Sequence, residues 1–274
     1  MDKKVLSRDG TPLAYERHGD GPAVVLVGGA LCTGATLAPL ARALSDRFGA
    51  VTYDRRGRGA SGDTASPCTV AREVEDIAAL IGACGGGAAL YGVSSGGALA
   101  LRAAASGLPV DAVAVYETPF TLHEDGGRRR EYTGRLTELL ARDRRGDALE
   151  LFMTLTGMSS EMIAGARRSP GWAGMEAIAP TLAYDDAVMG DGLLPRELPA
   201  SLPMPVLSVA GGAGPAWMRE SARAVADAAP RGTCRVLEGQ THAVEAAILA
   251  PLLAPSSSRA AGASREALHR GGTG

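Results

Sequence analysis

The sequence has no apolar run approaching the ~20 residues that a membrane-spanning helix needs. Its first residues, Met1–Lys4, lead into a strand-like segment and not into the apolar core of a signal peptide. It also lacks an excess of charge of either sign, since 28 Lys and Arg residues against 30 Asp and Glu residues give a formal net charge of −2. This balance argues against a nucleic-acid clamp or a polybasic membrane anchor. We therefore expect a soluble, cytoplasmic protein that binds neither nucleic acid nor membranes.

Cysteine is scarce as well. The four cysteines, Cys32, Cys68, Cys84 and Cys234, lie far apart, without a CxxC pair or the spacing of a metal finger. They predict ordinary reduced thiols and no metal site. Apolar residues nevertheless make up 46% of the 274 residues, so the chain can bury a sizeable core as one large or two small domains.

Strand-like and helix-like segments alternate along the first part of the chain. Ala23–Val27 is an uninterrupted apolar run between Gly-Pro and Gly-Gly, which is typical of a strand covered on both faces. Before it, two segments of alternating polarity flank the turn signal Asp9-Gly10 and predict an antiparallel pair at a sheet edge. Further strands are expected at 50–53, 88–91 and 112–116, with helices at about 34–46, 70–82 and 95–105. This alternation predicts an α/β fold with a mostly parallel sheet flanked by helices.

The strand signal disappears from about Thr121 to Pro203. Helical spacing there predicts helices at 128–143, 147–156, 160–168 and 171–182, with Met153, Met158, Met162 and Met175 on their apolar positions. After Pro205 the pattern resumes, with strands at 206–210 and 233–237 and helices at 215–229 and 243–253. We therefore expect a core formed by residues 1–120 and 204–254, a helical insertion at 121–203, and a disordered tail at 255–274.

The most specific local motif is Gly-x-Ser-x-Gly at residues 92–96, between the strand Ala88–Tyr91 and an Ala-rich helix. A serine at such a junction lies on a sharp turn that exposes its hydroxyl, which makes Ser94 a candidate nucleophile. The alternative is an ordinary Gly-rich turn. A hydroxyl needs a base, and the chain has four histidines. Of His18, His123, His242 and His269, only His242 lies in a loop that follows a late strand, so we predict that it is the base.

These motifs, in this order, resemble the α/β-hydrolase superfamily from about Gly10 to Leu253. The resemblance also includes the edge pair, the passage from 24 to 30, the Arg-rich loop at 53–62 and a helical insertion that would act as a cap. It implies an oxyanion hole made by the backbone N–H groups of Ser95 and of Ala30 or its neighbour Leu31. The family usually has His-Gly in that second loop, whereas this chain has Gly28-Gly29.

The chain departs from the family at the acidic member of the triad. The family's common Gly-x-x-Asp falls on the stretch 209–215, which contains no carboxylate. Some branches instead carry the acid after the strand that follows the nucleophile, where this chain has Glu117. We therefore predict a triad of Ser94, Glu117 and His242, with a solvent-facing strand end as the alternative reading of Glu117. The rival acids are Glu220 and Glu245, which helical spacing can place on solvated faces, and Asp54, which we expect to be a structural partner of the Arg55–Arg58 loop.

An apolar substrate pocket is expected between the insertion and the core. Methionine adapts to irregular shapes, although most methionines at helical spacing belong to the core. The candidate lining residues are Leu31, Met153, Met158, Trp172, Met175, Met189 and Trp217. The run Arg128–Arg130 is expected to form a solvated helix face, with recognition of an anionic carrier as the alternative.

The leading hypothesis is a serine hydrolase that cleaves a carboxylic ester, lactone or thioester through an acyl-enzyme. Its partner would be a small, apolar acyl substrate, and no metal or organic cofactor is implied. A serine nucleophile disfavours alkyl-enzyme dehalogenase or epoxide-hydrolase chemistry, which needs a carboxylate at that position. Two alternatives stay open: a related protein that binds a small molecule or promotes its cyclisation or isomerisation, and a cofactor-free perhydrolase or haloperoxidase. The oligomeric state is left open.

Overall fold

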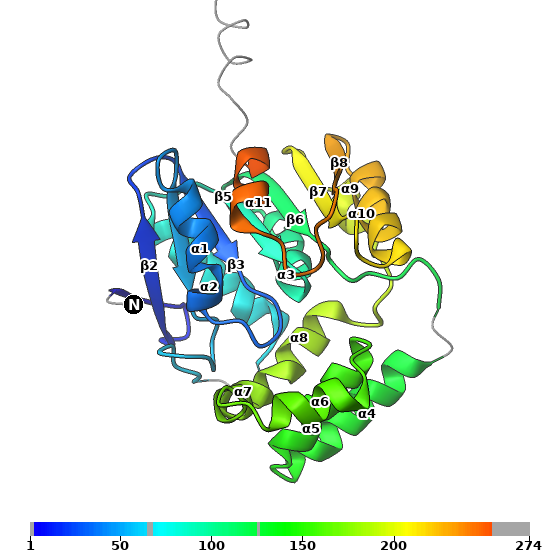
Figure 1. Cartoon of the computed structure of the whole chain (residues 1–274). Helices are drawn as coiled ribbons and strands as arrows, with labels where there is room; N and C mark the ends of the chain where they lie inside the picture. Colours follow the sequence, from blue (N-terminus) through cyan, green and yellow to red (C-terminus); the bar gives the residue numbers. More distant parts are fainter. Residues whose placement is uncertain (1–2, 65–67, 125–126, 254–274) are drawn as a thin grey trace, which may run out of the picture.

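The computed structural model describes residues 3–64, 68–124 and 127–253; the predicted tail at 255–274 lies outside the described residues. An eight-stranded sheet runs through the centre in the order β1-β2-β4-β3-β5-β6-β7-β8 (Figure 1). β2 pairs antiparallel with β1 and β4, and every other pair is parallel. The strands are β1 Lys3–Leu6, β2 Pro12–His18, β3 Ala23–Val27, β4 Gly49–Tyr53, β5 Ala88–Val93, β6 Val110–Tyr116, β7 Val206–Gly211 and β8 Gly232–Leu237. The predicted α/β fold and its antiparallel edge pair are therefore confirmed.

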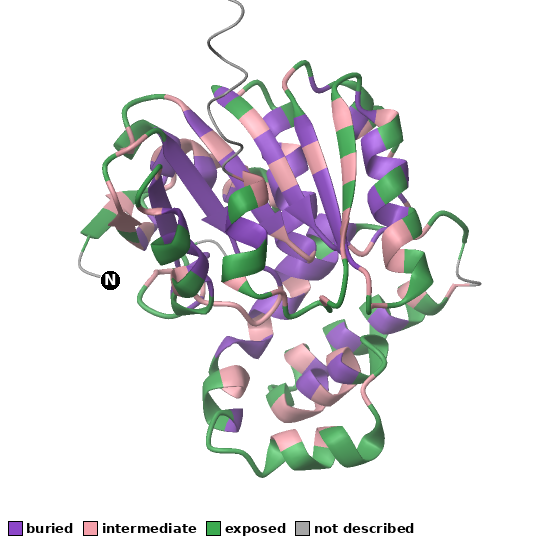
Figure 2. Cartoon of the chain, turned by 45° about the horizontal axis from the view of Figure 1, so that its top comes forward, coloured by how far each residue is buried: buried purple, intermediate pink, exposed green. Residues whose placement is uncertain are grey.

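The apolar pattern of each strand follows its place in the sheet. All five residues of β3 and all five of β4 are buried, as expected for strands covered by helices on both faces. β8 lies at one edge, and its residues alternate between partly buried and exposed (Figure 2). The uninterrupted run at 23–27 therefore marked a central strand.

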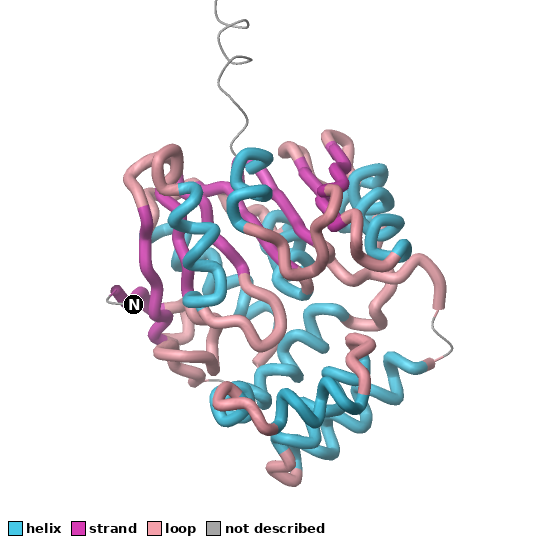
Figure 3. Tube along the Cα trace, in the orientation of Figure 1, coloured by secondary structure: helices cyan, strands magenta, loops and turns pink. Residues whose placement is uncertain are grey.

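Two apolar clusters cover the two faces of the sheet. One joins the sheet to α2, α3 and α10, and the other joins it to α1 and α11. Figure 3 shows these helices on either side of the strands. Their bounds are α1 Gly34–Leu44, α2 Val70–Ala83, α3 Ser95–Ala105, α10 Ala216–Ala228 and α11 Ala246–Leu253. Helices thus cover both faces of the sheet, so a binding or catalytic site is expected in the loops at the ends of its strands.

The chain between β6 and β7 is helical, and its helices between residues 128 and 189 form the layer drawn below the sheet in Figure 1. It has a small apolar core of its own, centred on Leu136, Leu149 and Trp172. Its elements are α4 Arg128–Ala141, α5 Arg145–Leu155, α6 Ser160–Arg167, α7 Trp172–Ile178, η1 Ala179–Thr181, α8 Leu182–Met189 and α9 Glu197–Ala200. We call residues 121–203 the inserted segment. Within this segment, α8 packs against α3 of the core.

Three sequence expectations about the inserted segment are wrong. The single helix predicted at 171–182 ends at Ile178, because Pro180 lacks an N–H and disrupts the regular helix; a short 3₁₀ turn follows, and then the unpredicted α8 begins. Met162 is 58% exposed and is not part of the apolar core. Arg129 is not a solvated side chain, since its guanidinium lies 2.7 Å from the carboxylate of Asp186 in α8.

The described residues contain no helix that is both long and apolar enough to cross a membrane. Within the same ranges, no three His, Cys, Asp or Glu side chains are grouped so that they could hold a metal ion. All four cysteines are described, and each is a free thiol.

Candidate active site

Ser94 occupies a strained turn between β5 and α3. Its backbone has φ 56° and ψ −131°, a conformation that few residues other than glycine adopt. The turn is held by two hydrogen bonds of 2.9 Å: the Ser94 N–H donates to the carbonyl of Tyr116, and the Ser94 carbonyl accepts from the N–H of Gly97. A Cβ on Gly92 would lie 2.3 Å from the carbonyl oxygen of Gly96, so the strand and helix meet this closely only because Gly92 has no side chain. The sequence motif thus produces the sharp turn that it predicts, with Ser94 partly buried.

The loop after β3 passes directly beside this turn. A Cβ on Gly29 would lie 2.9 Å from Cβ and 3.5 Å from Oγ of Ser94. Leu31 has a positive φ of 59°, and the N–H of Cys32 donates to the carbonyl of Gly29 at 3.2 Å, which makes the loop a tight turn. Ala30 and Leu31 pack against the apolar core of the inserted segment. The candidate oxyanion loop and the candidate nucleophile therefore lie together, beneath the helices.

Glu117 and His242 form a hydrogen-bonded pair. His242 Nδ1 lies 2.7 Å from Glu117 Oε2, and Glu117 Oε1 accepts the N–H of Gly211 at 2.9 Å. The glutamate is buried, with 1% exposure, whereas the side chain of His242 is 51% exposed. The loop that carries the histidine is tied down by Tyr116, whose hydroxyl donates to the carbonyl of Thr241 at 2.6 Å. The pair thus combines a fixed, buried carboxylate with an imidazole that reaches solvent.

The position of Glu117 explains the missing family aspartate. In the family pattern Gly-x-x-Asp, Gly211 and Gly214 stand at the glycine and aspartate positions. A Cβ on Gly214 would lie 3.0 Å from Glu117 Oε1. The glutamate therefore brings its carboxylate from the end of β6 to the loop in which the family usually places its acid.

The other acids considered from sequence do not approach the histidine in this way. Glu220 and Glu245 are exposed. The carboxylate of Asp54 accepts the N–H groups of Gly34 and Ala60, each at 2.8 Å, and so fixes the two loops that follow β3 and β4. Among the described residues, no hydrogen bond joins the Ser94 hydroxyl to the His242 ring; such contacts are often long in an enzyme without substrate.

The remaining histidines are placed elsewhere. His18 lies on β2, with its ring 3.7 Å from Glu16, and His123 is exposed at the start of the inserted segment. His269 lies outside the described residues.

The predicted pocket residues divide into two groups. Leu31, Met153, Met158, Trp172 and Met175 all belong to the apolar cluster of the inserted segment or pack against it. The remaining two do not. Met189, at the end of α8, is buried in the sheet core with α2 and α3, and Trp217, at the start of α10, is 43% exposed. Neither residue is part of the cluster beside Leu31, and their place in a substrate pocket stays a prediction.

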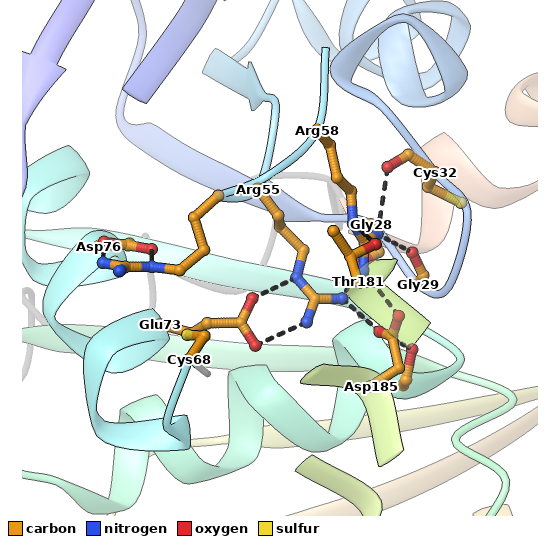
Figure 4. Close-up of polar contacts among 12 residues, drawn as sticks. Gly28, Gly29, Cys32, Arg55, Arg58, Cys68, Glu73, Asp76, Thr181 and Asp185 are labelled. Atoms are coloured by element: carbon orange, nitrogen blue, oxygen red, sulfur yellow. Dashed lines mark hydrogen bonds and ion pairs between the residues drawn. The ribbon is translucent and has the colours of Figure 1, made fainter. Parts of the chain in front are cut away.

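Sequence reasoning missed a buried ion-pair cluster next to Ser94. Arg55 contacts Glu73 and Asp185, and Arg58 contacts Asp185, at distances between 2.6 and 2.8 Å (Figure 4). These carboxylates pair with the guanidinium groups, whereas Asp54 holds the same loop through the backbone N–H of Ala60, in line with the structural role expected of it. Burial alone would raise the pKa of Asp185, but the charges of Arg55 and Arg58 hold this pKa below its usual value.

One signal in the sequence could have indicated the cluster. Arg55, Arg56 and Arg58 follow a fully buried strand, and arginines that are drawn into a core need carboxylate partners. The carboxylate that Arg55 and Arg58 share, Asp185, belongs to α8, which the sequence did not reveal.

Comparison with known proteins identifies the family of this fold. Residues 24–254 match the alpha/beta hydrolase family. A pimeloyl-acyl-carrier-protein methyl ester esterase of Xanthomonas campestris pv. campestris is 31% identical over 236 residues, covering 82% of this chain and 89% of that protein. The crystal structure of an alpha/beta hydrolase from Sphaerobacter thermophilus is 48% identical, with a TM-score of 0.83 over 92% of this chain and 98% of that one.

A bromoperoxidase structure from Bacillus anthracis, 18% identical, has a TM-score of 0.71 over 92% of this chain and 98% of that chain. At this identity the likeness concerns the fold alone, so it does not bear on the chemistry. The eight-stranded sheet, the serine turn between β5 and α3, and the match over residues 24–254 lead to one conclusion: this chain belongs to the alpha/beta hydrolase family.

Proposed function

We propose that the protein is a serine hydrolase that cleaves a carboxylic ester of a small, apolar acyl group. Ser94 would be the nucleophile, His242 the base and Glu117 the group that orients it. The observation that supports this proposal most directly is the 2.7 Å contact between Glu117 and His242 Nδ1. It fixes the proton on Nδ1 and leaves Nε2 as the ring nitrogen available to a hydroxyl.

The proposed reaction has two halves. In the first, His242 takes the hydroxyl proton while Ser94 Oγ attacks the acyl carbon, and the carbonyl oxygen becomes an oxyanion. The backbone N–H groups of Ser95 and of Ala30 or Leu31 would stabilise that charge. The leaving alcohol then takes the proton from His242. In the second half, water gives a proton to His242 as its oxygen attacks the acyl carbon. The bond between that carbon and Ser94 Oγ then breaks, His242 returns the proton to Oγ, and the acid is released.

The inserted segment supports an apolar acyl group as substrate. Leu31, next to the serine turn, packs against the cluster that contains Met153, Trp172 and the partly buried Met158 and Met175. A chain of methylene groups placed against such a surface gains roughly 0.8 kcal/mol for each group buried. The ester specificity named for the Xanthomonas relative, a methyl ester esterase, is of the same reaction class.

The proposal is tested with p-nitrophenyl esters of increasing acyl length and with a fluorophosphonate probe. We expect turnover of these esters, with kcat/KM rising from acetate to hexanoate, and covalent labelling of one serine. Ser94→Ala should abolish both signals. Ser106→Ala, which changes an exposed serine at the other end of α3, is the matched control and should leave both intact.

A wild-type protein that hydrolyses none of these esters and stays unlabelled would contradict the proposal and favour a non-hydrolytic binding pocket. Turnover and labelling that survive Ser94→Ala would instead show that another residue is the nucleophile.

A further inference from the structure

Asp185 contacts the serine turn from the inserted segment. This aspartate belongs to α8, and its side chain is 7% exposed. Its Oδ1 accepts the hydroxyl of Ser95 at 2.8 Å and a guanidinium N–H of Arg55 at 2.6 Å. Its Oδ2 accepts a guanidinium N–H of Arg58 at 2.7 Å. Ser95 is the first residue of α3, directly after Ser94, so one carboxylate reaches the start of the helix whose N–H groups face the site.

The same two arginines hold the loop on the other side of Ser94. Arg58 donates to the carbonyls of Gly29 at 2.5 Å and Cys32 at 3.2 Å, and Arg55 donates to the carbonyl of Gly28 at 3.2 Å (Figure 4). The Gly29 carbonyl and the Ala30 N–H share one planar peptide unit and point in opposite directions. A hydrogen bond that fixes that carbonyl therefore also fixes the direction of the Ala30 N–H.

We propose that Asp185 is a positioning residue that aligns both backbone donors of the oxyanion hole. It would hold the Ser95 side through the serine hydroxyl and the Ala30 side through Arg55 and Arg58. The inference rests on the proposed function, and it adds a residue of the inserted segment to the catalytic geometry of the core.

Burial and charge make this linkage rigid. Arg55 also donates from Nε and Nη2 to the two carboxylate oxygens of Glu73, at 2.7 and 2.8 Å. The guanidinium cations of Arg55 and Arg58 are thus matched by the carboxylates of Glu73 and Asp185. All four side chains are at most 7% exposed. Buried charges matched in this way have few alternative partners, so the cluster keeps a single arrangement. The alignment of the two donors then depends on α8 remaining docked against α3.

The test compares Ser95→Ala and Asp185→Asn with Asp186→Asn as matched control. Asp186 is the next residue of α8, and its carboxylate lies 2.7 Å from the guanidinium of Arg129 in α4. Three quantities are measured: kcat and KM for p-nitrophenyl butyrate, and the inhibition constant of a trifluoromethyl ketone, which forms a tetrahedral adduct whose oxyanion occupies the hole.

We expect Asp185→Asn to lower kcat about 100-fold, at the lower end of the roughly 10²- to 10³-fold range for loss of an oxyanion donor. Ser95→Ala should lower kcat only about 10-fold, because it loosens one backbone donor without removing it. The inhibition constant should rise by similar factors while KM stays within twofold, because ground-state binding does not use the hole. Asp186→Asn should keep kcat and the inhibition constant within twofold of wild type, even where it lowers the melting temperature.

The inference would be overturned if the Ser95→Ala variant had the same kcat and the same inhibition constant as the wild-type protein. That variant keeps every ion pair, so it decides the question even if Asp185→Asn does not fold. The inference would also be overturned if Asp186→Asn changed kcat and the inhibition constant as much as Asp185→Asn does, because equal changes would indicate general loosening of α8. Failure of the proposed function is seen separately, in the unsubstituted protein, as absence of ester turnover and of fluorophosphonate labelling, and it would remove this inference with it.

Discussion

Two buried carboxylates lie on either side of the Ser94 turn, and their partners differ in kind. Glu117 is bound to the half-exposed imidazole of His242, a ring in which one nitrogen can donate a proton while the other accepts one. Asp185 is bound to Arg55 and Arg58, whose guanidinium groups stay charged at any physiological pH. The first pair is therefore suited to move protons, and the second to hold geometry.

The two carboxylates also come from different parts of the chain. Glu117 follows β6 and depends on the neighbouring strand β7, whose Gly211 N–H it accepts. Asp185 comes from the inserted segment and reaches the core through α8. Replacing each carboxylate by the amide of the same size should then show which one matters more for catalysis and which one matters more for stability.

The largest expected effect is on catalysis, from Glu117→Gln. The amide has the shape of the carboxylate, but it favours the wrong imidazole tautomer and does not stabilise the imidazolium, so kcat for ester hydrolysis should fall by roughly 10³ to 10⁴. Because the partner imidazole can rehydrate, the free energy of unfolding should change by no more than about 1 kcal/mol. Steady-state kinetics and urea unfolding measure the two quantities. A kcat within tenfold of wild type would show that Glu117 does not orient the base.

Asp185→Asn should have the larger effect on stability. Among the residues that the structure describes, it leaves Arg58 without an ion-pair partner, and breaking a buried ion pair in this way costs about 3–5 kcal/mol. Urea unfolding followed by circular dichroism should therefore give a much lower midpoint for this variant than for Glu117→Gln. Equal midpoints for the two variants would remove the contrast between the two carboxylates.

The sequence was most informative where local pattern decides structure. The run at 23–27 gave a central strand, and Gly-x-Ser-x-Gly gave the strained turn at Ser94, because both depend on neighbouring residues. Glu117 could be proposed because some branches of the family carry their acid after the strand that follows the nucleophile, and the parallel pairing of β6 with β7 brings this position close to the loop after β7.

The same patterns could not reveal Asp185. Its partner Arg55 is 130 residues away in the chain, and their contact depends on how α8 docks on α3. The helix predicted at 171–182 runs through Pro180 and ends where α8 begins, so α8 itself was not predicted. The signal that marks this helix in retrospect is the spacing of its apolar residues Leu182, Val188 and Met189, whose side chains are all buried.

The stabilising effect of Asp185 should depend on pH with a definite sign. Its pKa is lowered in the folded protein, so its contribution is complete above the ordinary carboxyl pKa of about 3.9 and is lost as the pH falls through the lower, folded value. The difference in unfolding free energy between wild type and Asp185→Asn should be constant from about pH 7 to 5 and shrink below about pH 4. Urea unfolding at a series of pH values measures it. A difference that grows on acidification would contradict this assignment.

The smallest effect is a partial rescue that tests whether the acid can be moved. A Cβ on Gly214 would lie 3.0 Å from Glu117 Oε1, so Gly214→Asp combined with Glu117→Ala returns a carboxylate close to the lost one and restores the Gly-x-x-Asp pattern. We expect kcat about tenfold above that of Glu117→Ala alone, equivalent to about 1.4 kcal/mol. Gly212→Asp in the same background is the control, because a Cβ there would lie 2.9 Å from Oε2 of Glu238, which repels a second carboxylate. Recovery in neither variant would mean that His242 needs the carboxylate to approach from β6, and equal recovery in both would mean that any added negative charge suffices.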